Sequence, residues 1–143
     1  MKTVKQILES KPSYFNVVTP DTTVLDALRV MKNENLSYVI VMDEEKYQGV
    51  MSEKDYSRKV ILEGKDSTNT CVKEIMEDDM LPFIDINDTS DKCLAMMNTF
   101  KARYLPVLDD QHFRGVITLH DIMRIILAEK ISTNSLNFFN DDY

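Results

Sequence analysis

Apolar residues recur at helical spacing between residues 24 and 36, and polar residues stand just before them. This spacing predicts an amphipathic helix. Asp21 or Thr22 is the candidate N-cap, because both side chains can accept a hydrogen bond from the first turn of a helix. Two short apolar runs follow, at 38–42 and 48–51, and the polar segment 43–46 between them predicts a strand hairpin.

The hairpin is followed by a second helical pattern, expected over 53–62 with Ser52 as its N-cap. A short helical start at 4–8 and a brief extended segment at 15–19 precede the first helix. The order of predicted elements is therefore a lead-in helix, a strand, a helix, two strands and a helix.

The same pattern occurs a second time. Residues 23–61 align without a gap on residues 89–127, and Val4–Leu8 corresponds to Val72–Met76. The predicted elements of the second copy are an extended segment at 83–86, a helix capped by Thr89 or Ser90, strands at 104–108 and 114–117, and a helix at 120–129 capped by Thr118. Ten aligned positions are identical: Thr23/Thr89, Leu28/Leu94, Met31/Met97, Tyr38/Tyr104, Val41/Val107, Asp43/Asp109, Gly49/Gly115, Val50/Val116, Asp55/Asp121 and Arg58/Arg124.

Such a repeat predicts an α+β fold in which two β-α-β-β-α copies share a core, because about 60 residues alone bury too little surface. We expect the two sheets to pack together with the helices outside, around an approximate two-fold axis. The expected boundaries are residues 1–65 for the first copy, 66–130 for the second and 131–143 for a tail. Most tails of this kind are frayed ends, although Leu136, Phe138 and Phe139 could dock on a partner.

Composition excludes several classes of protein. The 143 residues carry a net charge of −7, which disfavours nucleic acids and anionic membranes as partners. No apolar run is long enough to span a bilayer, the N-terminus does not resemble a signal peptide, and Cys71 and Cys93 suit a reducing compartment, so we expect a cytoplasmic protein.

Catalytic chemistry finds little support in the sequence. The two histidines, His112 and His120, belong to no cluster with metal-ligand spacing, and no nucleophile motif or glycine-rich phosphate loop is present. We therefore expect no enzyme, no catalytic residue and no metal site. An active site assembled from distant residues, including one that uses NADH, remains a minor alternative.

The most informative segment is Gly49–Asp55, with its counterpart Gly115–Asp121. In each, a glycine precedes a short apolar strand, a hydroxyl residue stands at the strand-to-helix junction and an aspartate follows three positions later. Backbone N–H groups at a helix start suit an anion, and an aspartate there can accept two hydrogen bonds from a ribose diol. Taken singly, each segment is also explained as a capping box. Its occurrence at equivalent places in both copies favours a nucleotide site.

These segments resemble the ribose-phosphate motif of CBS domains, the modules named after cystathionine β-synthase that occur in pairs as Bateman modules. The run 102–107 (Ala-Arg-Tyr-Leu-Pro-Val) is similar to the family's strand signature, and the stretch 52–61 resembles small stand-alone bacterial members. The resemblance covers about residues 4–130. It implies a regulatory module, without a required cofactor, that binds an adenosine nucleotide such as AMP, ADP, ATP, NADH or S-adenosylmethionine in clefts between the repeats.

The resemblance also implies roles for individual residues. Asp55 and Asp121 would hold ribose hydroxyls, with Ser52 and Thr118 near ribose or phosphate. Adenine would contact the extended segment and second strand of the opposite copy. The expected adenine contacts are Val17, Val18, Tyr38 and Val39 for the Asp121 cleft and Phe83, Ile84, Tyr104 and Pro106 for the Asp55 cleft. The candidate phosphate-neutralising cations are Lys54, Arg58, Lys59, His120 and above all Arg103, whose guanidinium can grip a phosphate through two hydrogen bonds.

Alternatives remain for these residues. The apolar residues at 17, 18, 83, 84 and 104 would also suit a core without any ligand, and Arg58 and Lys59 would suit a solvated helix face. Ser37 and Ile40 stand where the second copy has Arg103 and Pro106, so we expect two clefts of different affinity. We expect a homodimer that modulates a partner enzyme or transporter. The alternative is a dimerisation and protein-interaction module that binds no ligand.

Overall fold

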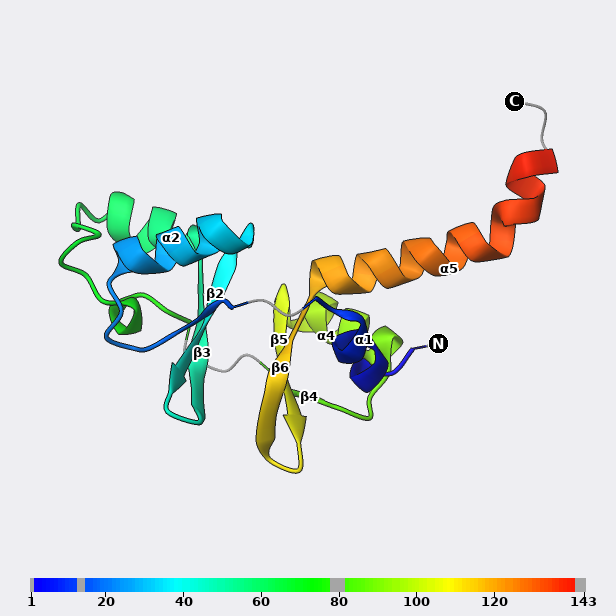
Figure 1. Ribbon diagram of the computed structural model, residues 1–143, viewed down its shortest axis with the longest axis horizontal. Coiled ribbons are helices and arrows are strands. Elements are labelled where there is room, and N and C mark those ends of the chain that lie inside the picture. The colour runs from blue at the N-terminus through cyan, green and yellow to red at the C-terminus, as the bar shows by residue number, and fades with distance from the viewer. Residues whose placement is uncertain (1, 13–14, 78–81, 141–143) are drawn as a thin grey trace. The chain divides into compact units, whose positions relative to one another are not determined.

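The computed structural model describes residues 2–12, 15–77 and 82–140, with side chains up to residue 131 (Figure 1). Its elements, in chain order, are α1 (Val4–Ser10), β1 (Val17–Val18), α2 (Val24–Glu34), β2 (Tyr38–Asp43), β3 (Lys46–Ser52), α3 (Glu53–Tyr56) continuing into a π-helical turn (Ser57–Ile61), a 3₁₀ turn (Val72–Glu74), β4 (Ile84–Asp85), α4 (Ser90–Phe100), β5 (Tyr104–Asp109), β6 (His112–Thr118) and α5 (Leu119–Asn140).

The chain forms two compact units. The central unit is residues 12–80, and the terminal unit combines residues 1–11 with residues 81–143. Each unit has a three-stranded sheet, in the order β1-β2-β3 or β4-β5-β6, with helices packed against it. The predicted α+β class, with two copies of one pattern, is therefore confirmed.

The lead-in segments are exchanged between the repeats. Val4 and Ile7 of α1 begin the first repeat in sequence, but they lie in the apolar core of the terminal unit with Ile84, Leu105 and Ile117. Correspondingly, Val72 and Ile75, which begin the second repeat, are buried in the core of the central unit. A compact unit is thus one repeat completed by the lead-in of the other.

Both sheets follow one hydrogen-bonding scheme. The short first strand pairs in parallel with the second, which pairs antiparallel with the third. In each hairpin the register shifts immediately after the pair that contains the motif glycine, Val41 with Gly49 and Val107 with Gly115. These glycines have φ of 157° and 148°, a region essentially restricted to glycine. The motif glycine is therefore required by a β-bulge.

Helix starts agree with the sequence prediction except at α2. Thr89 caps α4 as expected, but the N-cap of α2 is Thr23, whose side chain accepts from the Asp26 N–H. The predicted caps are engaged elsewhere. Thr22 Oγ1 accepts the N–H of Thr19, and Asp21 forms an ion pair with Lys73 at 2.8 Å.

The last helix is longer than predicted. The sequence predicts a helix over 120–129, whereas α5 continues to Asn140. No glycine or proline occurs within it, so nothing in the backbone requires the helix to stop. The side chains of Leu136, Phe138 and Phe139 lie outside those described, so their docking role stays a prediction.

Candidate functional site

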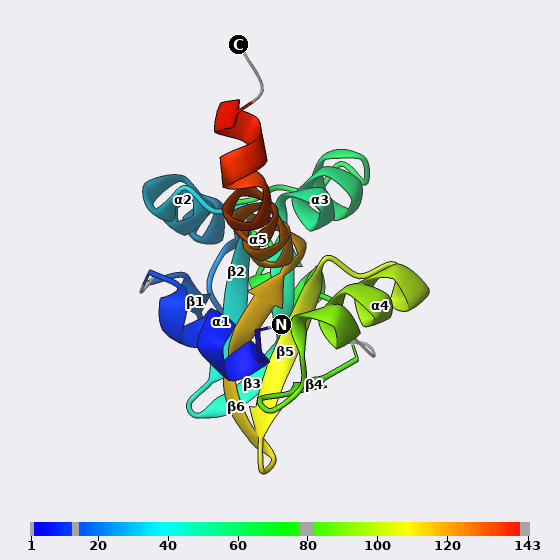
Figure 2. The same ribbon diagram turned by 90° about the vertical axis from the view of Figure 1, so that its right-hand side faces the viewer.

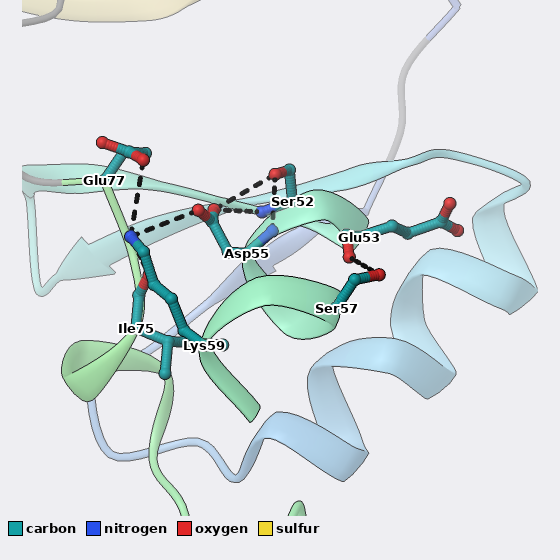
Figure 3. Close-up of polar contacts among 7 residues, drawn as sticks. All are labelled: Ser52, Glu53, Asp55, Ser57, Lys59, Ile75 and Glu77. Atoms are coloured by element: carbon teal, nitrogen blue, oxygen red, sulfur yellow. Dashed lines mark hydrogen bonds and ion pairs between the residues drawn. The ribbon is translucent and has the colours of Figure 1, made fainter. Parts of the chain in front are cut away.

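The first strand-to-helix junction lies where β3 leads into α3. Its Asp55 carboxylate accepts hydrogen bonds through Oδ2 from the backbone N–H of Ser52 at 2.8 Å and from the Ser52 hydroxyl at 3.1 Å (Figure 3). In return, the Asp55 N–H donates to Ser52 Oγ. This is the capping box foreseen from the sequence, and it leaves Asp55 only 3% exposed.

A cation lies on the other side of this carboxylate. The ammonium of Lys59 is 3.4 Å from Asp55 Oδ1 and also 3.4 Å from Glu77 Oε1, and it donates to the Ile75 carbonyl. Figure 3 shows Lys59 reaching between the two carboxylates. We call Ser52, Asp55, Lys59 and Glu77 the central junction.

The second junction lies where β6 leads into α5, and it repeats the capping box. Thr118 N–H donates to Asp121 Oδ2 at 2.9 Å, and Asp121 N–H donates to Thr118 Oγ1 at 3.1 Å. Two cations contact this buried carboxylate: Lys11 Nζ at 2.9 Å from Oδ2 and Arg124 at 2.7 Å from Oδ1. We call Thr118, Asp121, Lys11 and Arg124 the terminal junction.

The ionisable groups respond to these contacts. Burial alone would raise the pKa of Asp121, but the Thr118 N–H and the Lys11 ammonium outweigh it and lower that pKa. For Lys59, desolvation opposes the charged form, whereas the carboxylates of Asp55 and Glu77 favour it and raise the pKa. Both shifts favour the charged form, so the Asp121 carboxylate and the Lys59 ammonium stay charged at neutral pH.

Sequence reasoning missed Lys11 and Glu77. Lys11 follows α1 and Glu77 follows the second lead-in segment, and both reach the third strand of their unit at equivalent residues. Lys11 Nζ donates to the Val116 carbonyl, and the backbone of Glu77 exchanges two hydrogen bonds with Val50. The exchange of segments that brings both residues to the junctions could not be read from the repeat.

The backbone also brings position 37 and position 103 to the junctions. The Ser37 carbonyl accepts the N–H of Glu53, and the Arg103 carbonyl accepts the N–H of Leu119. Arg103 therefore lies at the start of α5 beside the terminal junction, whereas the corresponding residue of the central unit is an uncharged serine. Tyr38 and Tyr104 pair in register with Ser52 and Thr118, so each tyrosine is also placed at its junction.

The remaining predicted residues divide between core and surface. Val17 and Phe83 are 54% and 48% exposed, so neither is the core residue that the alternative interpretation requires. Fully or largely buried positions are Val18, Tyr38, Val39, Ile84 and Pro106, with Tyr104 half-buried. The exposed cations are Lys54, Arg58, Arg103 and His120.

Two further findings concern metal ions and membranes. In the described part of the chain, no group of three or more His, Cys, Asp or Glu side chains could hold a metal ion. None of the helices described is long and apolar enough to cross a lipid bilayer.

The chain is similar to proteins of one family. A mitochondrial CBS domain-containing protein of Arabidopsis thaliana, CBSX3, is 29% identical over 115 residues, which cover 78% of this chain and 56% of that protein. The chain thus spans little more than half the length of that relative. A solved structure of a protein with CBS domains from Burkholderia ambifaria has a TM-score of 0.81 at 33% identity, covering 89% of this chain and 95% of that one.

Two more distant structural neighbours were solved with adenosine compounds. CBSX2 in complex with AMP has a TM-score of 0.71 at 22% identity, covering 91% of this chain and 99% of that one. The CBS domain pair of MJ0100, in complex with 5′-methylthioadenosine and S-adenosyl-L-methionine, has a TM-score of 0.75 at 22% identity, with coverage of 90% and 98%. At this identity they show the shared fold.

The family itself is established by sequence. The model of the CBS domain matches the chain twice, over residues 4–61 and 72–128, which together make up most of its length. Each match contains one complete hairpin and one junction. The protein therefore belongs to the CBS-domain family.

Proposed function

We propose that this chain is a regulatory module that binds an adenosine-containing ligand at its two junctions and thereby changes the behaviour of a partner protein. The observation that carries the proposal is the repetition of one polar arrangement. At equivalent strand ends of two units, a hydroxyl residue, a buried aspartate and at least one cation lie within hydrogen-bonding or ion-pairing distance.

The aspartates retain capacity for a ribose diol. A carboxylate can accept about four hydrogen bonds. Among the described residues, Asp55 Oδ1 has only the 3.4 Å contact with Lys59, longer than the ~2.8 Å of a strong charged hydrogen bond. Asp121 Oδ1 is bonded to Arg124, a half-exposed side chain that can rotate away. Binding at either aspartate therefore requires only the displacement of a partly exposed cation.

Apolar surface is also present in both units. Val17 and Phe83 lie in equivalent extended segments, next to strands of the sheet, and about half of each side chain is accessible. Exposed apolar side chains beside polar groups are typical of a site for a planar base. We assign adenine contacts to these residues, ribose contacts to Asp55 and Asp121, and phosphate contacts to the cations predicted above. The adenosine compounds bound by CBSX2 and MJ0100 support the same ligand class.

The test is thermal unfolding with AMP, ADP, ATP, NADH and S-adenosylmethionine at about 1 mM each. A ligand at about 100 times its dissociation constant adds about 2.7 kcal/mol and raises Tm by several degrees. A rise with at least one ligand is the expected result. No rise with any of them would contradict the proposal.

A second candidate is a dimerisation and protein-interaction module that binds no ligand. Met123, Leu127 and Ile131 follow one another at intervals of four along α5, and they are 51%, 55% and 69% exposed. Such an apolar stripe is typical of a helix that packs on a partner. We propose a homodimer for both candidates, and sedimentation of the wild type against Leu127→Glu tests it. Loss of the dimer is expected, and an unchanged monomer mass in both would contradict it.

A further inference from the structure

The two junctions differ in charge. Around Asp121 lie the cations Lys11 and Arg124, and Arg103 is placed at the same helix start by its backbone hydrogen bond to Leu119. Of these cations, Lys11 and Arg124 contact the Asp121 carboxylate. The terminal junction is therefore positively charged overall.

The central junction has no excess of positive charge. Lys59 is shared between two carboxylates, Asp55 and Glu77, at 3.4 Å from each. Among the residues that the structure describes, Arg58 forms no ion pair with Asp55, although its counterpart Arg124 is bound to Asp121. The neighbours on the helix, Glu53 and Lys54, cancel each other, and position 37 is a serine. When Arg58 is counted, the net charge of the side chains around the central junction is zero, and without Arg58 it is negative.

We propose that the two junctions select adenosine ligands of different charge: the terminal junction takes a 5′-phosphorylated adenosine, and the central junction takes an adenosine derivative without phosphate. A 5′-phosphate carries a charge between −1.5 and −2 at neutral pH. The phosphate is attracted by the unbalanced cations near Asp121 and repelled by Glu77 near Asp55. This inference rests on the proposed function and assigns its ligand classes.

Lys11 and Glu77 are the residues that create the difference. Lys11 follows α1 and Glu77 follows the second lead-in segment, and neither belongs to the ten identities between the repeats. After the first lead-in segment the cation of Lys11 contacts Asp121, and after the second the carboxylate of Glu77 contacts Lys59. The exchange of segments therefore gives two otherwise similar junctions opposite electrostatic character.

The test compares AMP with 5′-methylthioadenosine, which keeps the nucleoside and lacks the phosphate, by calorimetric titration of the full chain. Arg124→Gln removes one half-exposed cation from the terminal junction, and Lys11 still neutralises Asp121. We expect AMP affinity to fall about three- to fivefold and 5′-methylthioadenosine affinity to stay unchanged. The matched control is Arg114→Gln, which removes a similarly exposed arginine paired with Asp109. Arg114 lies in β6 next to the hairpin turn. That turn is at the opposite end of β6 from α5 (Figure 2).

The reverse change tests the central junction. Glu77→Gln leaves the backbone pairing with Val50 intact and removes the negative charge, so a second, tighter AMP-binding event is expected. Glu45→Gln, on the exposed turn between β2 and β3, is the control with the same change in net charge. In 0.5 M salt, the changes in AMP affinity caused by Arg124→Gln and Glu77→Gln should be smaller, whereas 5′-methylthioadenosine binding should not change.

Three outcomes separate the possibilities. If Arg124→Gln and Arg114→Gln weaken AMP binding equally, the affinity depends only on the net charge of the protein and the inference is wrong. If Arg124→Gln weakens both ligands equally, the arginine does not recognise phosphate and the inference is again wrong, while the proposed function stands. If neither ligand binds the wild type, the proposed function and this inference fail together.

Discussion

Lys11 and Asp121 lie near opposite ends of the chain, and the ammonium of Lys11 is 2.9 Å from Asp121 Oδ2. Lys11 is the residue after α1, and Asp121 lies in the first turn of α5. Their side chains are only 12% and 4% exposed. The pair therefore fixes the exchanged lead-in segment to the motif carboxylate of the terminal unit.

Replacing Lys11 should destabilise the protein. Lys11→Met removes one ion pair from a buried carboxylate and one hydrogen bond from the Val116 carbonyl, while Arg124 still compensates part of the charge. We expect a loss of about 2 kcal/mol in the free energy of unfolding, measured by urea denaturation. Lys5→Met, at an exposed position of α1, is the control and should change stability by less than about 0.5 kcal/mol. Equal effects of the two substitutions would show that the pair contributes nothing.

The motif glycine gives a prediction of its own. A Cβ at Gly115 would lie 3.2 Å from Leu8 Cδ2, and the φ of 148° is strained for any other residue. Gly115→Ala should therefore cost about 2 kcal/mol or more, because strain and contact with α1 add. Gly64→Ala has a φ of +68° and no neighbour within 4 Å, so it should cost only about 1 kcal/mol. A smaller loss at position 115 than at position 64 would contradict the packing of α1 on β6.

Acid should weaken the terminal junction. The folded-state pKa of Asp121 lies below its ordinary value of 3.8, so the unfolded chain binds more protons as the pH falls toward and below that value. The contribution of this carboxylate is fully present above about pH 5 and is lost as the pH falls through its folded pKa. Unfolding followed between pH 2 and pH 6 should therefore show a shallower loss of stability in Asp121→Asn than in the wild type. If the free energy of unfolding depends on pH with the same slope in both proteins, Asp121 does not contribute to acid sensitivity.

The repeat predicted most of the fold. Helical and strand periodicity placed α2, α4 and both hairpins within a few residues, because each element has one apolar face and clear polar ends. The cap at Thr23 was missed because three consecutive polar residues precede α2, and only the tertiary contacts of Asp21 and Thr22 decide among them. The extent of α5 was underestimated for a different reason, because weak polar helix formers do not by themselves indicate where a helix stops.

The site was predictable in part. Ser52, Asp55, Thr118 and Asp121 were found because both copies carry them at the same spacing, and the structure brings each pair together. The cations that contact the aspartates were not all found. Lys11 lies far from Asp121 in the sequence, and the segment that contains Lys11 packs with the second repeat. Contacts that depend on an exchanged segment leave no local pattern. The assignment of individual residues to ribose, base or phosphate stays a prediction.

The most direct test of the central claim is calorimetric titration of AMP into the wild type and into Asp55→Asn combined with Asp121→Asn. Asparagine keeps one oxygen for each capping box, so folding should persist, and circular dichroism checks it. The matched control, Asp21→Asn with Asp109→Asn, removes two exposed carboxylates that also form ion pairs away from the junctions. The account predicts saturable binding to the wild type and the control, and none to the junction variant. Equal binding to all three, or no binding to the wild type, would contradict it.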